Sequence, residues 1–279
     1  MLAVSELYIY PVKSLGGFSV PAATITDRGF EYDRRWMLVD ENNRFLTQRE
    51  IPLMALLQAQ LADNVLRVYH KIAGHAINIP LIPQTGKTAS VQIWDDTCTV
   101  QLVSTQADHW FSDILSIRCR LVYMPSATKR MVNENYALQN EITSLSDGYP
   151  FLIIGQASLD ELNSRLAEPL PIDRFRPNIV FIGGEAFEED LMEHFTINGI
   201  DFYAVKPCAR CMITTINQDS AAQSKEPLRT LARYHSHDHK VYFGQNLLHK
   251  GDGVVKVGDV ITIEKKKAIR NFTTGVSQS

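Results

Sequence analysis

The fold is constrained most by a long succession of short segments that are apolar or alternate between apolar and polar residues. Glycine, proline, asparagine and aspartate separate these segments, which is typical of β-strands joined by turns. In the first half they are LYIYPV (7–12), ATITD (23–27), RWMLVD (35–40), RFLTQ (44–48), VLRVYH (65–70), ASVQIW (89–94), CTVQLV (98–103) and CRLVYM (119–124). In the second half they are NIVFIGG (178–184), FTINGIDFYAVKP (195–207), MITTIN (212–217) and VGDVITIEKKK (257–267). We therefore expect a mainly β protein.

Three segments predict short helices among these strands. Residues 105–116 place several large apolar side chains near helical spacing on one side. Ser158 is suited to cap a second helix because Glu161 follows three residues later, and Pro169 ends that segment. Residues 226–234 predict a third helix with a proline near its start.

Many strands with few helices favour β-barrels with α insertions over a repeated βαβ arrangement. The chain has neither a GxGxxG motif nor a Walker loop, so the usual support for a nucleotide-binding fold is missing. The polar stretch 125–150 is long for a connection in a compact protein, and it is therefore a candidate linker or active-site loop.

Composition and charge narrow the class of protein. Hydrophobic residues make up 45% and charged residues 21% of the 279-residue chain, and the formal net charge is −3. The composition is that of a soluble globular protein, and the charge argues against a general nucleic-acid binder. The N-terminus lacks the pattern of a secretory signal, and no segment approaches the apolar length of a membrane-spanning helix. We expect a cytoplasmic protein without nucleic-acid or membrane partners.

The cysteines provide the first chemical signal. Four cysteines without a secretory signal fit free thiols in a reducing compartment. Cys98 and Cys119 stand alone in strand-like segments and are expected to be buried. Cys208 and Cys211 form a pair in KPCARC, three residues apart. This spacing is compatible with half of a zinc site, a redox dithiol or a single thiolate ligand.

A zinc site would need two further ligands. The nearest histidines are in YHSHDHK, at His235, His237 and His239. This run is one residue short of the HxHxDH signature of metallo-β-lactamase folds, and we expect a solvated polar loop there. A redox dithiol would place the pair at the start of a helix, whereas the following MITTIN predicts a strand. A single thiolate ligand for a soft metal remains, and the nearby Lys206 and Arg210 would favour an ionised thiol.

Several motifs together resemble one family. In chain order they are LYIYPVKSLGG (7–17), DRRWMLVD (33–40), FLTQRE (45–50), LSDGYPFLI (145–153), RFRPNIVF (174–181), KPCARCMITTIN (206–217), EPLRTL (226–231), FGQNL (243–247) and VGD (257–259). They resemble the MOSC-domain molybdenum cofactor proteins. Within that family the chain looks similar to the amidoxime-reducing components and to the bacterial reductases of N-hydroxylated bases.

The resemblance implies an architecture and a cofactor. It implies an N-terminal MOSC-associated β domain at residues 1–124, a MOSC β-barrel domain at 125–265, and a polar tail at 266–279. It also implies a molybdenum–molybdopterin cofactor whose metal is held by a dithiolene and by one protein thiolate. By family position that metal ligand is Cys211, and Cys208 is a bystander that packs beside the site.

The same resemblance implies the residues that bind the cofactor. Molybdopterin carries a phosphate, so cationic side chains and hydrogen-bond donors are expected around it. In the segment IIGQAS, only Ala157 and Ser158 match the Thr-Asp-Ala-Ser of close relatives. Ser158 is therefore open to two interpretations, a helix cap or a cofactor contact. The predicted cofactor-binding residues are Lys13, Ser14, Arg34, Ser158, Arg176, Asn178 and Arg210.

The function implied is reduction of N-hydroxylated compounds such as amidoximes, hydroxylamines and hydroxylaminopurines. Bacterial relatives often carry a ferredoxin domain with a C-x4-C-x2-C run, which this sequence does not contain. Either electrons come from a separate ferredoxin- or flavoprotein-like donor, which we expect, or the sequence is a truncated form. Two alternatives are a sulfur carrier with a persulfide on Cys211 and a storage or transfer protein for the cofactor. Asp147 and Tyr149 border the suspected site loop without an assigned role. The segments 125–150 and 232–242 are expected to line the substrate pocket.

Overall fold

The computed structural model describes residues 1–62, 64–268 and 272. Within these residues, seven strands close a barrel, because β19 pairs with β17 on one side and with β14 on the other. Around the barrel the order is β14 (Phe151–Gly155), β15 (Ile179–Ile182), β1 (Leu2–Ile9), β21 (Val260–Lys266), β16 (Met192–Ile197), β17 (Ile200–Ala209) and β19 (Lys240–Lys250). Two short strands extend it: β2 (Phe18–Val20) pairs with β1, and β18 (Ser236–His237) pairs with β19.

Aromatic and branched aliphatic side chains fill the barrel. Phe195 and Phe202 stack with their ring centroids 5.6 Å apart, and Phe151 meets Phe202 edge to face at the same distance. All three rings are 1% exposed or less. Inward-facing residues alternate with outward-facing ones along each strand, so the apolar alternation visible in the sequence becomes the barrel core.

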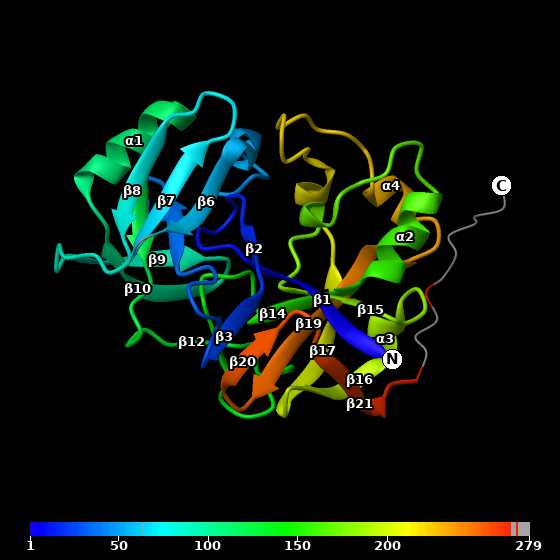
Figure 1. Ribbon diagram of the computed structural model, residues 1–279. Coiled ribbons are helices and arrows are strands. Elements are labelled where there is room, and N and C mark those ends of the chain that lie inside the picture. Colours follow the sequence, from blue (N-terminus) through cyan, green and yellow to red (C-terminus); the bar gives the residue numbers. More distant parts are fainter. Residues whose placement is uncertain (63, 269–271, 273–279) are drawn as a thin grey trace.

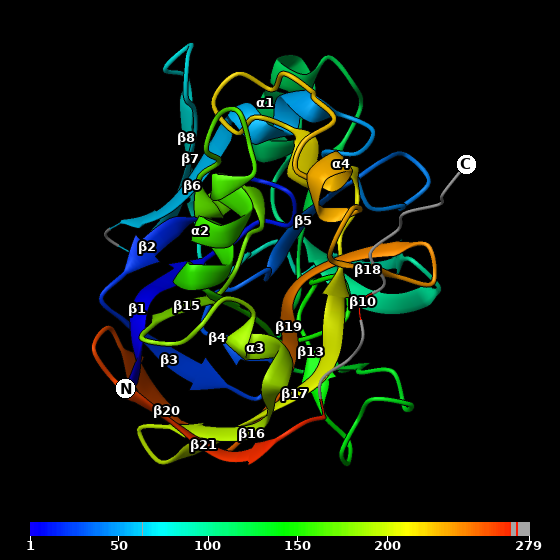
Figure 2. The same ribbon diagram turned by 90° about the vertical axis from the view of Figure 1, so that its right-hand side faces the viewer.

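A second group of sheets lies beside the barrel. A four-stranded sheet has the order β5 (Trp36–Val39), β11 (Arg120–Tyr123), β10 (Asp96–Leu102) and β9 (Thr88–Ile93). A three-stranded sheet contains β6 (Leu57–Ala62), β7 (Val65–His70) and β8 (Ala76–Pro80). Helix α1 (Thr105–Leu115) packs against them and is capped by the Ser104 hydroxyl. Figure 1 shows this group on the left and the barrel on the right, and Figure 2 views the same structure from the barrel side.

Smaller elements complete the described structure. Strands β3 (Ala22–Thr26), β4 (Gly29–Phe30) and β20 (Gly253–Lys256) form a three-stranded sheet, and β12 (Arg130–Met131) pairs with β13 (Ile142–Thr143). The other helices are α2 (Gln156–Ser164), α3 (Glu188–Leu191) and α4 (Leu228–Leu231). Single 3-10 turns are η1 (Pro52–Leu56), η2 (Ile172–Arg174) and η3 (Met212–Thr215).

The mainly β class with barrel architecture and α insertions is confirmed. The N-terminal strand β1 pairs with β15 and β21, so the first residues of the chain belong to the same barrel as residues after 150. The predicted division at residues 124/125 stays a prediction. Of the predicted tail, Lys266 ends β21, whereas residues 269–271 and 273–279 lie outside the described residues.

Two helix predictions need correction. Helix α2 begins at Gln156 and its N-cap is Gly155, so Ser158 lies inside the helix and does not cap it. A Cβ on Gly155 would lie 3.0 Å from both the Glu189 carboxylate and the Phe181 ring, so this crowded position favours glycine. The segment predicted as a helix over 226–234 has a four-residue helix, Leu228–Leu231, and continues as turns.

Two strand predictions are wrong. RFLTQ (44–48) forms isolated bridges through Arg44 and Phe45 and no strand. MITTIN begins with the 3-10 turn η3, because the hydroxyls of Thr214 and Thr215 donate to the carbonyls of Cys211 and Met212 at 3.0 and 2.7 Å. These local side-chain bonds satisfy carbonyl groups that a strand would pair with its neighbour.

Candidate functional site

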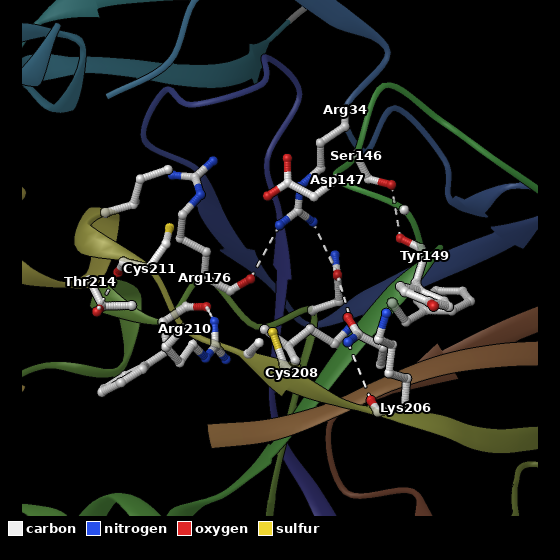
Figure 3. Close-up of a pocket in the computed structure, with 18 of the residues that line it drawn as sticks. Arg34, Ser146, Asp147, Tyr149, Arg176, Lys206, Cys208, Arg210, Cys211 and Thr214 are labelled. Atoms are coloured by element: carbon white, nitrogen blue, oxygen red, sulfur yellow. Dashed lines mark hydrogen bonds between the residues drawn. The ribbon is translucent and has the colours of Figure 1, made fainter. Parts of the chain in front are cut away.

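A cavity of about 290 Å³ lies at one end of the barrel, where strand β17 and the turn after it meet loops from the first half of the chain. The segment before β14 and the segment before β15 also contribute to its wall. Figure 3 shows the labelled side chains around the cavity: Arg34 from the first half of the chain, Ser146, Asp147 and Tyr149 from before β14, Arg176 from before β15, and Lys206, Cys208, Arg210, Cys211 and Thr214 from β17 and the turn after it. Seven predicted site residues line it, drawn from four distant stretches of sequence: Lys13, Ser14, Arg34, Arg176, Asn178, Arg210 and Cys211. Of the loop predicted over 125–150, residues 146–149 line the cavity, whereas no residue of 232–242 does.

Ser158 is the predicted site residue that the structure places elsewhere. It is fully buried, its hydroxyl donates to Oε2 of Glu189 at 2.7 Å, and it accepts the backbone N–H of Phe187 at 2.8 Å. It does not line the cavity. Both hydrogen bonds are internal to the fold, so the hydroxyl holds α2 against the segment around α3.

The cavity is strongly cationic. Among the described residues that line it, Asp147 is the one acidic residue and seven are basic: Lys13, Arg34, Arg49, Arg174, Arg176, Lys206 and Arg210. The chain as a whole carries a formal charge of −3, so this concentration of positive charge is local. Such a cavity attracts an anionic ligand.

Three of the predicted residues have strained backbones. Ser14, Arg34 and Arg176 have φ angles of 65°, 49° and 55°, in the left-handed region that side-chain-bearing residues seldom adopt. Residues held in this region cost about 1–3 kcal/mol each and often occur at ligand sites. The shared conformation turns three separate loops toward one cavity.

Two guanidinium groups share one aromatic ring. Arg34 and Arg176 each lie 4.4 Å from the ring centroid of Tyr10. Arg34 also donates from Nη1 to Oδ2 of Asp33 at 2.6 Å, and Arg176 donates from Nη1 to the carbonyl of Leu15 at 2.7 Å. Burial, and then the charge of Arg34, lower the pKa of Arg176 to about 10. The protein therefore holds two cations close together, which an anionic ligand would stabilise.

Asn178 lines the cavity, but its side-chain amide forms hydrogen bonds with other groups of the protein. Its Oδ1 accepts from Nη1 of Arg34 at 3.0 Å and from the backbone N–H of Leu152 at 3.3 Å. Its Nδ2 donates to the carbonyl of Tyr8 at 3.2 Å. Asn178 is 1% exposed, so the structure supports a role in positioning Arg34.

Lys13, Asp147 and Arg49 form a second charged group on the cavity wall. The ammonium of Lys13 donates to Oδ1 of Asp147 at 2.5 Å, and Arg49 lies 3.7 Å from Oδ2 of the same carboxylate. Burial lowers the pKa of Lys13 to about 8, although the Asp147 charge opposes that shift. Burial raises the pKa of Asp147, but the charges of Lys13 and Arg49 outweigh it and hold that pKa well below its usual range.

Cys211 lies beside this group. Its thiol is half-buried, directly precedes the turn η3, and accepts a hydrogen bond from Nε of Arg49 at 3.3 Å. Arg49 was not predicted as a site residue, although it lies in the quoted motif FLTQRE. FLTQRE is a second arginine-bearing motif in the same half of the chain as DRRW, and that arginine could have identified Arg49 as a site residue.

Arg210 has a donor without a partner. Its Nε donates to the carbonyl of Phe243 at 2.8 Å and its Nη1 to the carbonyl of Phe175 at 2.9 Å. Its Nη2 is buried and meets no acceptor among the described residues. A buried guanidinium that lacks an acceptor is unfavourable, so this arginine fits a ligand that supplies one.

Cys208 has a different environment from Cys211. It lies within β17, where burial raises the pKa of its thiol, so it favours the protonated form. Neighbouring Lys206 lies over the Tyr136 ring, 4.2 Å from its centroid, and 5.8 Å from that of Tyr149. Besides Arg49, the sequence interpretation missed Arg174, Thr214 and Asn246 on the cavity wall, because no local pattern distinguishes them from ordinary fold residues.

The histidine run is only partly a solvated loop. His237 and His239 are at least partly exposed, but His235 is 4% exposed and bonds Oδ2 of Asp190 at 2.9 Å and the carbonyl of Tyr242 at 2.8 Å. The solvated-loop prediction is therefore wrong for His235, which anchors the segment before β18. Throughout the described ranges, no three or more His, Cys, Asp or Glu residues cluster as a metal site would require.

Glu189 precedes Asp190 in the chain, and its buried carboxyl predicts how folding stability depends on pH. The carboxyl is fully buried, and burial followed by the charge of Asp190 raises its pKa from 4.5 to about 8. Folding then becomes less favourable as the pH rises from about 5 to 8, because the unfolded chain releases this proton more readily. We expect Glu189→Gln to raise stability at pH 8.5, by on the order of 3 kcal/mol, but little at pH 5.

Thermal unfolding across pH 5–9 tests this expectation. The matched control is Glu185→Gln, the same substitution at an exposed neighbour, which should leave the pH profile of the melting temperature unchanged. A Glu189→Gln variant whose profile parallels that of the unaltered protein would contradict the raised pKa.

In the described part of the chain, no helix combines the length and the apolar character needed to cross a bilayer. The predicted cytoplasmic localisation stays a prediction.

Comparison with known proteins identifies the family. Residues 1–118 match the MOSC N-terminal beta barrel domain, and residues 140–262 match the MOSC domain. The mitochondrial amidoxime-reducing component 1 of Mus musculus is 30% identical over 92% of this chain and 81% of its own length. Component 2 of Rattus norvegicus is 31% identical over 92% and 82%. The molybdenum cofactor sulfurase of Danio rerio is 31% identical over 88% of this chain but 32% of its own length. The chain therefore belongs to the MOSC-domain family.

Proposed function

We propose that this protein binds a molybdenum cofactor and reduces N-hydroxylated compounds such as amidoximes, hydroxylamines and hydroxylaminopurines. The observation that carries the proposal is a half-buried thiol, Cys211, on a cavity lined by seven basic side chains. The amidoxime-reducing relatives, which align with most of the chain, support the reaction class.

The chemistry of the cavity fits the cofactor. Molybdopterin is anionic, and the unpartnered Nη2 of Arg210 offers a hydrogen bond to an acceptor that the described protein does not supply. Arg34 and Arg176, stacked on Tyr10, offer further cationic donors. Cys211 offers a soft thiolate sulfur as the protein's ligand to molybdenum. Asn178 positions Arg34 from behind.

The reaction is balanced as one N-hydroxylated substrate, two electrons and two protons giving the reduced nitrogen compound and water. The chemistry that the cofactor supplies when bound is removal of the oxygen atom from the N–O bond. The protein's own residues hold the metal through Cys211, balance the cofactor charge through the arginines, and shape access to the site. In this proposal, water supplies the protons and a separate ferredoxin- or flavoprotein-like protein supplies the electrons.

The test combines molybdenum and pterin analysis of freshly purified protein with benzamidoxime turnover driven by a chemical reductant. Equimolar molybdenum together with turnover would support the reductase. Molybdenum without turnover would favour a storage or transfer protein. Absence of pterin together with cyanide-labile sulfur on Cys211 would overturn the reductase in favour of a sulfur carrier.

A further inference from the structure

The cavity that holds Cys211 and the seven basic side chains is called the cofactor cavity below, after its proposed ligand. A second hollow opens directly beside it. We call it the aromatic groove; it has a volume of about 510 Å³ and is lined by Asp40, Arg44, Phe45, Leu46, Thr47, Arg49, Glu50, Gln92, Trp94 and Asp95. Arg49 belongs to both hollows, and its Nε lies 3.3 Å from the sulfur of Cys211. One side chain therefore separates the aromatic groove from the proposed metal ligand.

Two further contacts join the hollows. The indole Nε1 of Trp94 donates to Oδ1 of Asp147 at 3.4 Å, and the ammonium of Lys13 lies 5.4 Å from the ring centroid of Phe45. Lys13 and Asp147 line the cofactor cavity, whereas Trp94 and Phe45 line the groove. The two hollows therefore adjoin at Arg49, Trp94 and Asp147.

Trp94 occupies an unusual position. It begins the two-residue turn between β9 and β10, since Ile93 pairs with Asp96, and its φ is 55°. A turn residue with positive φ is usually glycine or asparagine, and a bulky side chain there is strained by about 1–3 kcal/mol. The indole is nevertheless 43% exposed, so burial in the core does not explain it. The turn presents a large aromatic surface at the mouth of the site.

The indole is held in place from two sides. The guanidinium of Arg49 lies 4.5 Å from its ring centroid, and the ring of Phe45 meets it edge to face at 4.9 Å. Such contacts limit the freedom of the indole and prepare its exposed surface for stacking.

The charge of the groove differs from that of the cavity. Three carboxylates, Asp40, Glu50 and Asp95, line it against two arginines. Glu50 and Asp95 are exposed and can accept hydrogen bonds from N–H groups. The cationic cavity therefore suits the anionic cofactor, whereas the groove suits a neutral or cationic ring that carries nitrogen donors.

From these observations we infer that the aromatic groove is a substrate subsite, in which Trp94 stacks on the planar ring of an aromatic N-hydroxylated amidine or aminopurine. Trp94 is then a specificity-determining residue that favours aromatic over small aliphatic substrates. This inference rests on the proposed reductase function and specifies its substrate class.

The test compares kcat/KM for benzamidoxime and for acetamidoxime, an aliphatic counterpart, in cofactor-loaded protein. Trp94→Gly removes the ring and relieves the positive φ, so a loss of folding is not expected to confuse the result. We expect the ratio of kcat/KM for benzamidoxime to kcat/KM for acetamidoxime to fall about tenfold, as for the loss of one aromatic stacking contact. Trp94→Phe should restore most of the ratio. Ile72→Gly, an equally drastic change at an exposed residue outside both hollows, should not alter it.

Calorimetric binding of benzamidine and acetamidine provides a readout independent of turnover. Benzamidine should bind the unaltered protein more tightly than acetamidine, and Trp94→Gly should remove most of that difference. An unchanged substrate ratio in Trp94→Gly, or no preference for benzamidine in the unaltered protein, would overturn the subsite. If neither amidoxime is reduced by loaded protein, the proposed function fails, while the amidine measurement still decides whether the groove binds aromatic rings.

Discussion

Replacing Cys211 by serine is expected to abolish turnover of N-hydroxylated substrates, lowering kcat by more than a hundredfold. Substitutions in the shell around a metal ligand typically cost about 10–100-fold in affinity or activity, and loss of the ligand itself should exceed that. A serine hydroxyl is a harder ligand than a thiolate and stays protonated where a thiol ionises, so it is a poor replacement for the thiolate as a ligand of molybdenum. The measurement is reductant-driven benzamidoxime turnover per bound molybdenum.

Cys208→Ser is the matched control, since the same substitution is made three residues away on the same cavity. The pKa of Cys208 is raised by burial, and its thiol is not expected to ligate the metal. We expect this variant to keep at least about half of the turnover. Equal losses in the two variants would refute the assignment of Cys211 as the single ligand and would favour a dithiol or zinc site.

Arg176→Met should lower the molybdenum and pterin content of the purified protein by at least about tenfold. Removing one partner of a buried charged contact commonly costs about 2–5 kcal/mol of binding free energy. A loss of about 1.4 kcal/mol already weakens binding tenfold. The cation repulsion between Arg34 and Arg176 is relieved by the same substitution, so the cofactor-free protein should remain folded. Metal analysis and pterin fluorescence measure the cofactor, and circular dichroism measures folding.

Arg118→Met serves as its control, because the Arg118 side chain is 86% exposed and pairs only with the exposed Glu41 among the described residues. Surface pairs of this kind contribute little, so cofactor content should be unchanged. Normal cofactor content in Arg176→Met would show that the stacked arginines do not bind the cofactor.

Local patterns predicted much of the secondary structure. The segment 65–70 coincides with β7, and 105–116 differs by one residue from α1. Such segments are decided by residues close in sequence, namely apolar periodicity and capping. MITTIN failed because two threonine hydroxyls bond to nearby carbonyls, a choice that β-propensity alone does not register.

The candidate site was partly visible in the sequence. Motifs that resemble the family placed Lys13, Arg34, Arg176 and Cys211 in one site, and the structure brings all four to the same cavity. Arg49 was not predicted, because its contact with Cys211 spans 162 positions and depends on how two loops pack. The prediction for Ser158 was wrong for the opposite reason. Its local sequence suggested a helix cap, whereas packing places its hydroxyl against Glu189.

By itself, the sequence determined the strand-rich class, the resemblance to the family and most of the residue types around the cofactor cavity. These features depend on periodicity and on motifs whose residues are neighbours in the chain. Only the tertiary structure decided that β14 and β19 close the barrel, that Arg49 bonds to Cys211, and that Trp94 borders a groove. Each of these depends on the distance between side chains far apart in sequence, and that distance is set only when the barrel and the neighbouring sheets pack together.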